Sequence, residues 1–270
     1  MPSITFKPKA VSKKLLTTLN PRTKEIVINR YGLEKGERMT LEAIGKTYDI
    51  TRERVRQIEN FALATIKKSK EFKEHAFIFD ELRTILKELG SVVSEEHLMH
   101  TISKDPVIQN HINLYLALGE EFTKHKEDDH FNAHFSIDNK ISGHVRDALH
   151  KLYGSISEED LIKEEEIYER FVGHLSEVVG EYKNNKEIIH RYLALSKVIG
   201  KNQLNEWGRV SSPHVKARGI KDYAYLIMRR KGEPMHFKEV ALEINKTFGK
   251  KAHVATCHNE LIKDSRFVLV

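Results

Sequence analysis

The sequence has little of what a secreted or membrane-bound protein needs. It contains one cysteine, Cys257, among 270 residues, which excludes an internal disulfide framework and fits a reducing compartment. No apolar run approaches the roughly 20 residues that cross a bilayer. The first residues, MPSITFKPKAVSKK, also lack the apolar core and cleavage site of a secretory leader. These absences predict an intracellular, cytoplasmic protein with no membrane partner.

Motifs of catalysis and metal binding are missing as well. The sequence contains no glycine-rich phosphate loop, GxSxG elbow or HExxH. His97 and His100 lie one helical turn apart, and His253 precedes Cys257 and His258, but neither group has the spacing of structural zinc ligands. The acidic stretches SEED and KEEEIYE are interpreted as solvated helix faces. We therefore expect no enzyme activity, no metal and no cofactor.

Positive charge is concentrated near the amino terminus. Residues 1–70 hold 16 Lys and Arg against 7 Asp and Glu, whereas the rest of the chain holds 29 against 32. A basic segment on a nearly neutral body indicates a polyanionic partner, because neutralising phosphates releases counterions and favours binding. Charge runs are also common on solvated faces, so charge alone leaves a nucleic-acid partner undecided.

Capping residues divide the basic segment into helices. Asn20, followed by a proline, opens a helix that Gly32 is placed to end. Thr40 can cap a short helix, TLEAIGKTY, and Thr51 can cap a longer one that runs to residue 68. Almost no loop remains between these two helices, and Asp49 tolerates the left-handed conformation that a tight corner requires. The pattern predicts a helix-turn-helix.

The second helix of this pair has two different faces. Val55, Ile58 and Ala62 recur at three and four residues and form a stripe for packing. The other side carries polar residues, namely Arg52, Glu53, Arg54, Arg56, Gln57 and Asn60. Arg can bond to guanine, Gln to adenine, and Glu can accept from the cytosine amine. Because phosphate binding has no use for a carboxylate, the face favours base reading. A charged helix stabilised by its own ion pairs is the alternative.

The blocks RYGL, TLEAIGK and TRERVRQIE resemble region 4 of the bacterial sigma-70 family, which recognises the upstream promoter hexamer. The resemblance covers residues 14–68, with the blocks in the family's order and spacing. It implies base contacts from Arg52, Glu53 and Gln57. Contacts to the DNA backbone or groove edge are expected from Thr40, Lys46, Thr51, Arg54 and Arg56.

The resemblance also implies partners and a location. In the family, the helices before the reading unit hold a flap of the large subunit of RNA polymerase, which here would involve the segment from Leu15 to Tyr31. The expected partners are therefore double-stranded promoter DNA and the RNA polymerase core, and the expected location is the bacterial nucleoid. Only about fourteen residues precede the resemblance, so we expect a detached region 4 module without the regions that melt promoters.

The chain beyond residue 72 contains an internal repeat. The matching segments are ELGSVVSEEHL (88–98) with LYGSISEEDL (152–161), and LYLAL (114–118) with RYLAL (191–195). A third, looser copy has Gly232 in the place of Gly90 and Gly154. Each copy is interpreted as a helix, a glycine turn, a capped helix, a third helix and a short strand-rich tail. This order predicts a winged helix, although a helical array used only as a spacer would repeat similarly.

The third copy carries a second resemblance. From about Gly219, the segments KGEPMHFKEVALEI and HNELIKDSRFVLV resemble the HARE-HTH winged helix, which also occurs in the polymerase delta subunit and in some restriction enzymes. In that family a wing strand follows the equivalent of RFVLV, so we expect a module truncated at its wing. Whether the winged helices contact DNA or protein stays open. The predicted domains are 1–72 (helix-turn-helix), 73–140 and 141–214 (winged-helix repeats) and 215–270 (HARE-HTH-like).

These features predict a mainly α fold: a region 4 helix-turn-helix followed by tandem winged-helix modules with short β wings. The predicted function is sequence-specific DNA binding by a sigma-like or RNA polymerase-associated transcription factor, which reads a promoter element through residues 51–68. Two alternatives remain. One is an adaptor that docks on polymerase and binds DNA weakly, and the other is the DNA-targeting component of a restriction or modification system.

Overall fold

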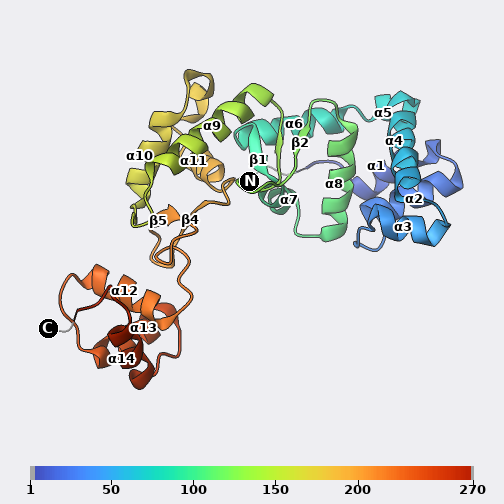
Figure 1. Ribbon diagram of the computed structural model, residues 1–270. Helices are drawn as coiled ribbons and strands as arrows, with labels where there is room; N and C mark the ends of the chain where they lie inside the picture. The colour runs from blue at the N-terminus through green and yellow to red at the C-terminus, as the bar shows by residue number, and fades with distance from the viewer. Residues whose placement is uncertain (1–3, 269–270) are drawn as a thin grey trace. The chain divides into compact units, whose positions relative to one another are not determined.

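The computed structural model describes residues 4–268, and these are mostly helical (Figure 1). This confirms the predicted mainly α fold with short strands in small sheets. The chain divides into two compact units, one formed by residues up to 128 with 132–143, and the other by 129–131 with 144–270. Among the described residues, no helix is long and apolar enough to cross a membrane.

The first unit begins with the helices predicted from capping residues. The Asn20 side chain accepts a hydrogen bond from the Thr23 amide at 2.9 Å, and Gly32 ends the same helix in the left-handed region at φ 65°. The elements are α1 (Pro8–Leu15), a 3₁₀ turn (Leu16–Thr18), α2 (Pro21–Tyr31), α3 (Leu41–Tyr48), α4 (Arg52–Lys68) and α5 (Lys70–Glu74).

A winged helix completes the first unit. Its elements are α6 (Phe77–Glu88), β1 (Val92–Ser94), α7 (Glu95–Ile102), α8 (Pro106–Leu118), β2 (Thr123–His125) and β3 (His134–Ser136). The strands form an antiparallel sheet in the order β1-β3-β2, with Phe135 of β3 opposite both Val93 and Lys124. Ser94 caps α7 by accepting from the His97 amide at 3.2 Å. The order of helices and strands is the one that the first sequence repeat predicts.

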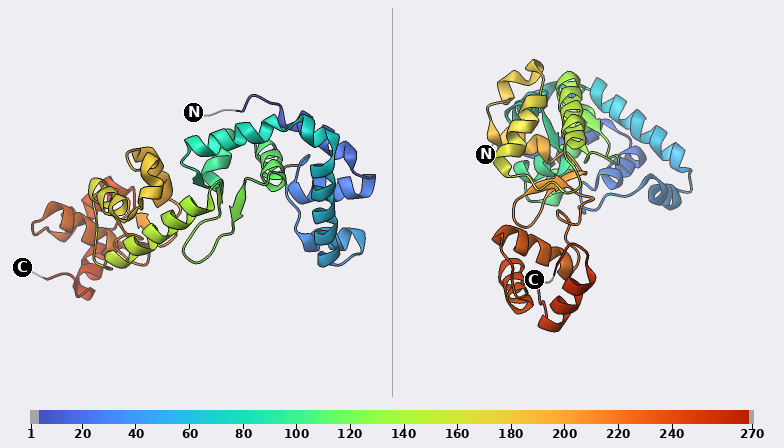
Figure 2. Two further views of the ribbon diagram at one scale, coloured as in Figure 1. Left: turned by 90° about the horizontal axis from the view of Figure 1, so that it is seen from above. Right: turned by 60° about the vertical axis from the view of Figure 1, so that its left-hand side comes forward.

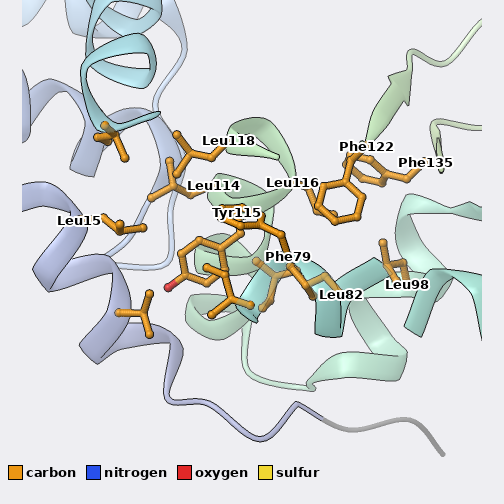
Figure 3. Packing of buried hydrophobic residues seen from close by; sticks show 14 of the residues in the cluster. Leu15, Phe79, Leu82, Leu98, Leu114, Tyr115, Leu116, Leu118, Phe122 and Phe135 are labelled. Carbon is orange, nitrogen blue, oxygen red and sulfur yellow. The ribbon is translucent and has the colours of Figure 1, made fainter. Parts of the chain in front are cut away.

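One hydrophobic cluster joins the helix-turn-helix segment to this winged helix. It contains Leu15, Val27 and Ile66 from the first set of helices together with Leu82 and Phe135 from the second. The close-up in Figure 3 places Leu114 and Leu118 of α8 near Leu15 of α1. Burying a large apolar side chain contributes about 1.5–3 kcal/mol, so both sides of residue 72 stabilise each other. The division into four modules remains a prediction, and the first two of these share a core.

The second unit contains the second sequence repeat. Its elements are α9 (Asn139–Ser155), which begins in the first unit, α10 (Glu164–His174), a 3₁₀ segment (Glu177–Tyr182), α11 (Lys186–Leu193), β4 (Ile199–Lys201) and β5 (Trp207–Arg209). An isolated bridge from Ile162 to Trp207 takes the place of the first strand. Trp207 is buried, so it packs within the core of the second unit.

The prediction of a glycine turn at Gly154 is wrong. Gly154 lies inside α9, which ends at Ser155, and α10 begins only at Glu164. The serine of the second SEE triplet, Ser157, therefore does not cap a helix. Instead its amide donates to the Asp160 carboxylate at 2.7 Å. The two copies thus have similar sequences but different backbone conformations at this point, because a glycine permits a turn without requiring one.

Three helices form the last part of the second unit: α12 (Ile220–Lys231), α13 (Phe237–Phe248) and α14 (Val254–Lys263). They enclose a cluster that includes Tyr223, Ile244 and the buried Cys257. Gly232 ends α12 at φ 70°. No strand occurs between residues 215 and 268, while the last two residues of RFVLV lie outside the described part. The HARE-HTH resemblance stays a prediction.

Candidate nucleic-acid interface

The turn between α3 and α4 is set by a few local contacts. Thr40 caps α3 by accepting from the Ala43 amide, and Thr51 caps α4 by accepting from the Arg54 amide, each at 3.1 Å. Between the helices, Asp49 adopts the left-handed conformation at φ 51° and ψ 49°. This confirms the predicted corner and both predicted caps, and it brings the start of α4 directly against α3.

Gly45 makes this tight corner possible. The Ile50 amide donates to the Gly45 carbonyl oxygen at 3.0 Å, so the chain folds back onto the end of α3. A β-carbon on residue 45 would lie only 2.6 Å from the Ile50 carbonyl oxygen. Glycine is therefore required here by close backbone approach rather than by its own dihedral angles.

A small core holds α4 in place with its polar side outward. Ile26, Ile44 and Val55 are fully buried against one another, and Ile58 is partly buried beside them. Ala62 also faces inward, but it joins the larger cluster shared with the winged helix. The predicted apolar stripe is confirmed, and it packs against two different cores along the length of α4.

Two residues that the sequence analysis did not single out fasten α4 to α2. The Arg30 guanidinium donates from Nε to the Glu59 carboxylate at 3.2 Å and from Nη1 to the Met39 carbonyl oxygen at 3.2 Å. Burial, together with the Glu59 carboxylate, raises the pKa of the Tyr31 hydroxyl. Glu59 is one more acidic residue on a charged helix, so no sequence pattern marks it as an anchor.

The exposed side of α4 carries two pre-formed pairs. The Arg56 guanidinium donates to both Glu53 carboxylate oxygens, at 2.6 and 2.9 Å, and Arg54 donates to the Gln57 side-chain oxygen at 3.1 Å. The hydrogen bond from Arg56 lowers the pKa of the Glu53 carboxyl, which therefore stays ionised. Two of the three predicted base readers, Glu53 and Gln57, are thus each held by an arginine three residues away, and all four side chains are exposed.

The structure brings several of the other predicted contacts to one place. Lys46, Thr51 and Arg52 line an open concavity of about 620 Å³ at the corner between α3 and α4. Lys46 is paired with Glu42 at 3.4 Å across an exposed surface, and such a pair is weak enough to exchange for a phosphate. After the larger effect of Arg56, the positive charge of Arg52 also helps to lower the pKa of the neighbouring Glu53 carboxyl. Thr40 is exposed at the start of α3.

The first winged helix does not offer a second reading helix. In a helix-turn-helix the second helix enters the major groove, and α8 has that position after α7. Eight of its side chains are buried, including those of Asn110, His111 and Tyr115. In the first winged helix, α8 therefore lacks the free polar face that α4 presents.

The histidine and cysteine groups noted in the sequence do not form a site. Across residues 4–268, no set of three or more His, Cys, Asp or Glu side chains is arranged to hold a metal ion. Cys257 is buried, and burial raises the pKa of its thiol, which disfavours the reactive thiolate.

The segment expected to hold the polymerase flap has one covered apolar face, while Arg22 and Glu25 of the same segment are exposed. Between Leu15 and Tyr31, the buried apolar side chains are those of Leu15, Leu16, Leu19, Ile26 and Val27. All of these except Ile26 belong to the cluster that α8 helps to form. The chain therefore covers this apolar face with its own winged helix.

Comparison with known proteins locates similarity in the same segment. Residues 15–68 match the family described as Sigma-70, region 4. The sigma factor SigA of Clostridium acetobutylicum is 43% identical over 65 residues, which are 23% of this chain and 17% of that protein. The principal sigma factor HrdD of Streptomyces coelicolor is 48% identical over 54 residues, covering 20% and 16% of the two chains. SigA of Nostoc sp. is 46% identical over 55 residues, covering 20% and 14%.

The family match covers the helix-turn-helix segment. This chain spans less than a fifth of the length of these three relatives. The family match ends at Lys68, the last residue of α4, so it includes the candidate interface and stops before the first winged-helix repeat.

Proposed function

We propose that this chain is a bacterial transcription factor, without enzyme activity, that binds duplex DNA and reads a promoter element through α4. The observation that carries the proposal is the exposed side of α4, where Arg52, Glu53 and Gln57 project from a helix-turn-helix that matches sigma region 4. A helix of this kind lies in the major groove with the residues of its first turns against the base edges.

The roles follow from side-chain chemistry. Arg52 donates to guanine, Gln57 bonds to adenine, and Glu53 accepts from a cytosine amine. The residues proposed to contact the DNA backbone or groove edges are Thr40, Lys46, Thr51, Arg54 and Arg56. Phosphate contacts orient the helix, and base contacts specify the sequence.

The two pairs on α4 support this assignment. Arg56 keeps Glu53 ionised and extended, so the carboxylate needs little reorganisation to meet a cytosine amine. Arg54 holds the Gln57 oxygen at 3.1 Å, which leaves the Gln57 amide group to donate to a base. Arg54 and Arg56 can turn to phosphates on either side of the groove, since an exposed pair costs little to break.

We also propose an association with RNA polymerase, because region 4 belongs to sigma factors. Polymerase is the partner that would place a promoter-reading module where transcription begins. The chain has the role of a sigma-like or polymerase-associated regulator, and in this proposal the melting of the promoter depends on another chain.

Selection of binding sites from random duplex DNA tests the proposal. The purified full chain should enrich one short sequence at moderate salt, with polymerase core present or absent. If no sequence is enriched under either condition, α4 is a basic docking face and the adaptor hypothesis replaces this proposal. An Arg52→Ala, Glu53→Ala, Gln57→Ala variant is the control, because it should bind without enriching any sequence.

A further inference from the structure

Helix α8 has two apolar faces, and each is buried against a different neighbour. Figure 3 places Leu116 toward Phe122 and Phe135 of its own winged helix, whereas Leu114 and Leu118 lie toward α1. Residues 107, 110, 111, 114, 115 and 118 each lie three or four residues from another member of the set, which places them in a single stripe along the helix. Helix α8 contacts α1, α2 and α4 (Figure 1; Figure 2, left).

Buried polar contacts fix the register of this stripe. The Tyr115 hydroxyl donates to the Pro8 carbonyl oxygen at 2.6 Å and lies 2.7 Å from the Ser12 hydroxyl. His111 Nδ1 lies 2.8 Å from the Ser12 hydroxyl oxygen. Ser12, His111 and Tyr115 are all buried. A buried polar group without its partner is costly, so these three side chains allow α8 only one position along α1.

A second set of contacts ties α8 to the loop between α2 and α3. Asn110 donates from its side-chain amide to the carbonyl oxygens of Gly32 and Gly36, at 3.1 and 2.8 Å. The Arg38 guanidinium in turn donates to the Asn110 side-chain oxygen at 2.6 Å. A β-carbon on Gly32 would lie 2.8 Å from the Asn110 amide nitrogen. The loop between α2 and α3 is therefore held in its conformation by contacts with α8.

We infer that α8 is a built-in partner helix for the face formed by α1, α2 and α4. An amphipathic helix lying in an apolar groove is a common form of protein recognition, and here the chain supplies that helix itself. A helix of another protein can bind this face only by displacing α8. The choice of partner rests on the proposed function, since the sigma resemblance assigns the polymerase flap to residues 15–31 of this face.

DNA reading and partner binding would use different sides of α4. Glu53 and Gln57 lie on the opposite side of α4 from Ala62 and Ile66, which pack in the cluster with α8, and Arg52 lies at the other end of the helix. DNA can therefore bind while α8 is in place. The polymerase flap, in contrast, binds only the small fraction of molecules in which α8 has left this face, with an affinity reduced by that fraction.

Binding of the flap domain of a bacterial RNA polymerase tests this inference. The full chain is compared with an Asn110→Ala, Tyr115→Phe variant, which loses five hydrogen bonds between α8 and its neighbours. A net loss of only two bonds, at about fivefold each, shifts the equilibrium by about 25-fold, so the variant should bind the flap at least about tenfold more tightly than the parent chain. Amide exchange of α1 and α2 should slow when the flap binds to the variant.

The matched control is Asn113→Ala. Asn113 lies on α8 as well, but it donates to Met99 Sδ of α7 and to the Gln109 carbonyl oxygen, so its loss should not improve flap binding. Flap binding that is equal in parent and double variant, or absent from both, would overturn the inference. Selection of DNA sites in the same samples reports on the proposed function separately.

A measurement on the unaltered chain covers the case in which the double variant does not fold. If α8 and α1 form one packed unit, their amide hydrogens should exchange with solvent at the same rate, because both helices then open in one cooperative step. Amides of α1 that exchange at least about tenfold faster than those of α8 would contradict a built-in partner helix.

Discussion

Replacing Gln57 with alanine separates base reading from simple charge attraction. Gln57 is exposed, and its only contact within residues 4–268 is the hydrogen bond that its oxygen accepts from Arg54 at 3.1 Å. The substitution leaves no buried group without a partner, so the free energy of unfolding should change by less than about 0.5 kcal/mol. Any large effect on DNA binding must then come from the interface itself.

The expected loss is specific to the preferred site. A two-bond contact from Gln57 to adenine contributes about 1–3 kcal/mol of discrimination, which corresponds to a roughly 5- to 150-fold weaker binding of the selected sequence. On random duplex the affinity should stay the same or rise slightly, because the substitution releases Arg54 to approach a phosphate. The ratio of the affinity for the selected sequence to the affinity for random duplex therefore falls by the same factor of roughly 5 to 150.

Competition binding at one fixed salt concentration measures both affinities. The labelled duplex carries the sequence obtained by selection, and the competitor is a scrambled duplex of the same length. Lys46→Ala is the matched control, since it removes an exposed charge at the same corner and should weaken both duplexes about equally. Equal losses on the two duplexes for Gln57→Ala would show that α4 does not read bases at this position.

Three further predictions concern stability and organisation. Asp49 has φ 51°, so Asp49→Val should lower the free energy of unfolding by about 1–2 kcal/mol whereas Asp49→Gly should not, and urea titration checks both. Burial lowers the pKa of His111 below its ordinary 6.5; the unfolded chain therefore takes up the proton first, and stability should fall as the pH drops below that value. His111→Gln should flatten this fall in urea titrations, and an unchanged slope would contradict the assignment. Trypsin should spare residues 70–73, because they form α5, which packs on the shared core through Phe72, and it should cut first at the exposed Lys216 and Arg218, as mass spectrometry of early fragments would show.

Local sequence determined the reading unit. Asn20, Thr40 and Thr51 cap helices as predicted, and Asp49 makes the left-handed corner between two of them. Such features depend on residues no more than four positions apart, so the sequence states them directly. The division of α4 into an apolar side with Val55 and a polar side could also be predicted, because helical geometry alone decides which side chains share a face. The roles assigned to these side chains on DNA stay predictions.

Tertiary structure decided what surrounds the reading unit. The anchor of Arg30 on Glu59 and the contact of Asn110 with Gly32 join residues 29 and 78 positions apart. Nothing in either local stretch distinguishes these residues from other polar side chains. The burial of α8 also follows from packing, because a helix that is apolar on two sides needs two neighbours and its sequence does not say which. The chain thus encodes locally the surface proposed to face DNA, whereas the closure of the opposite face is the result of long-range packing.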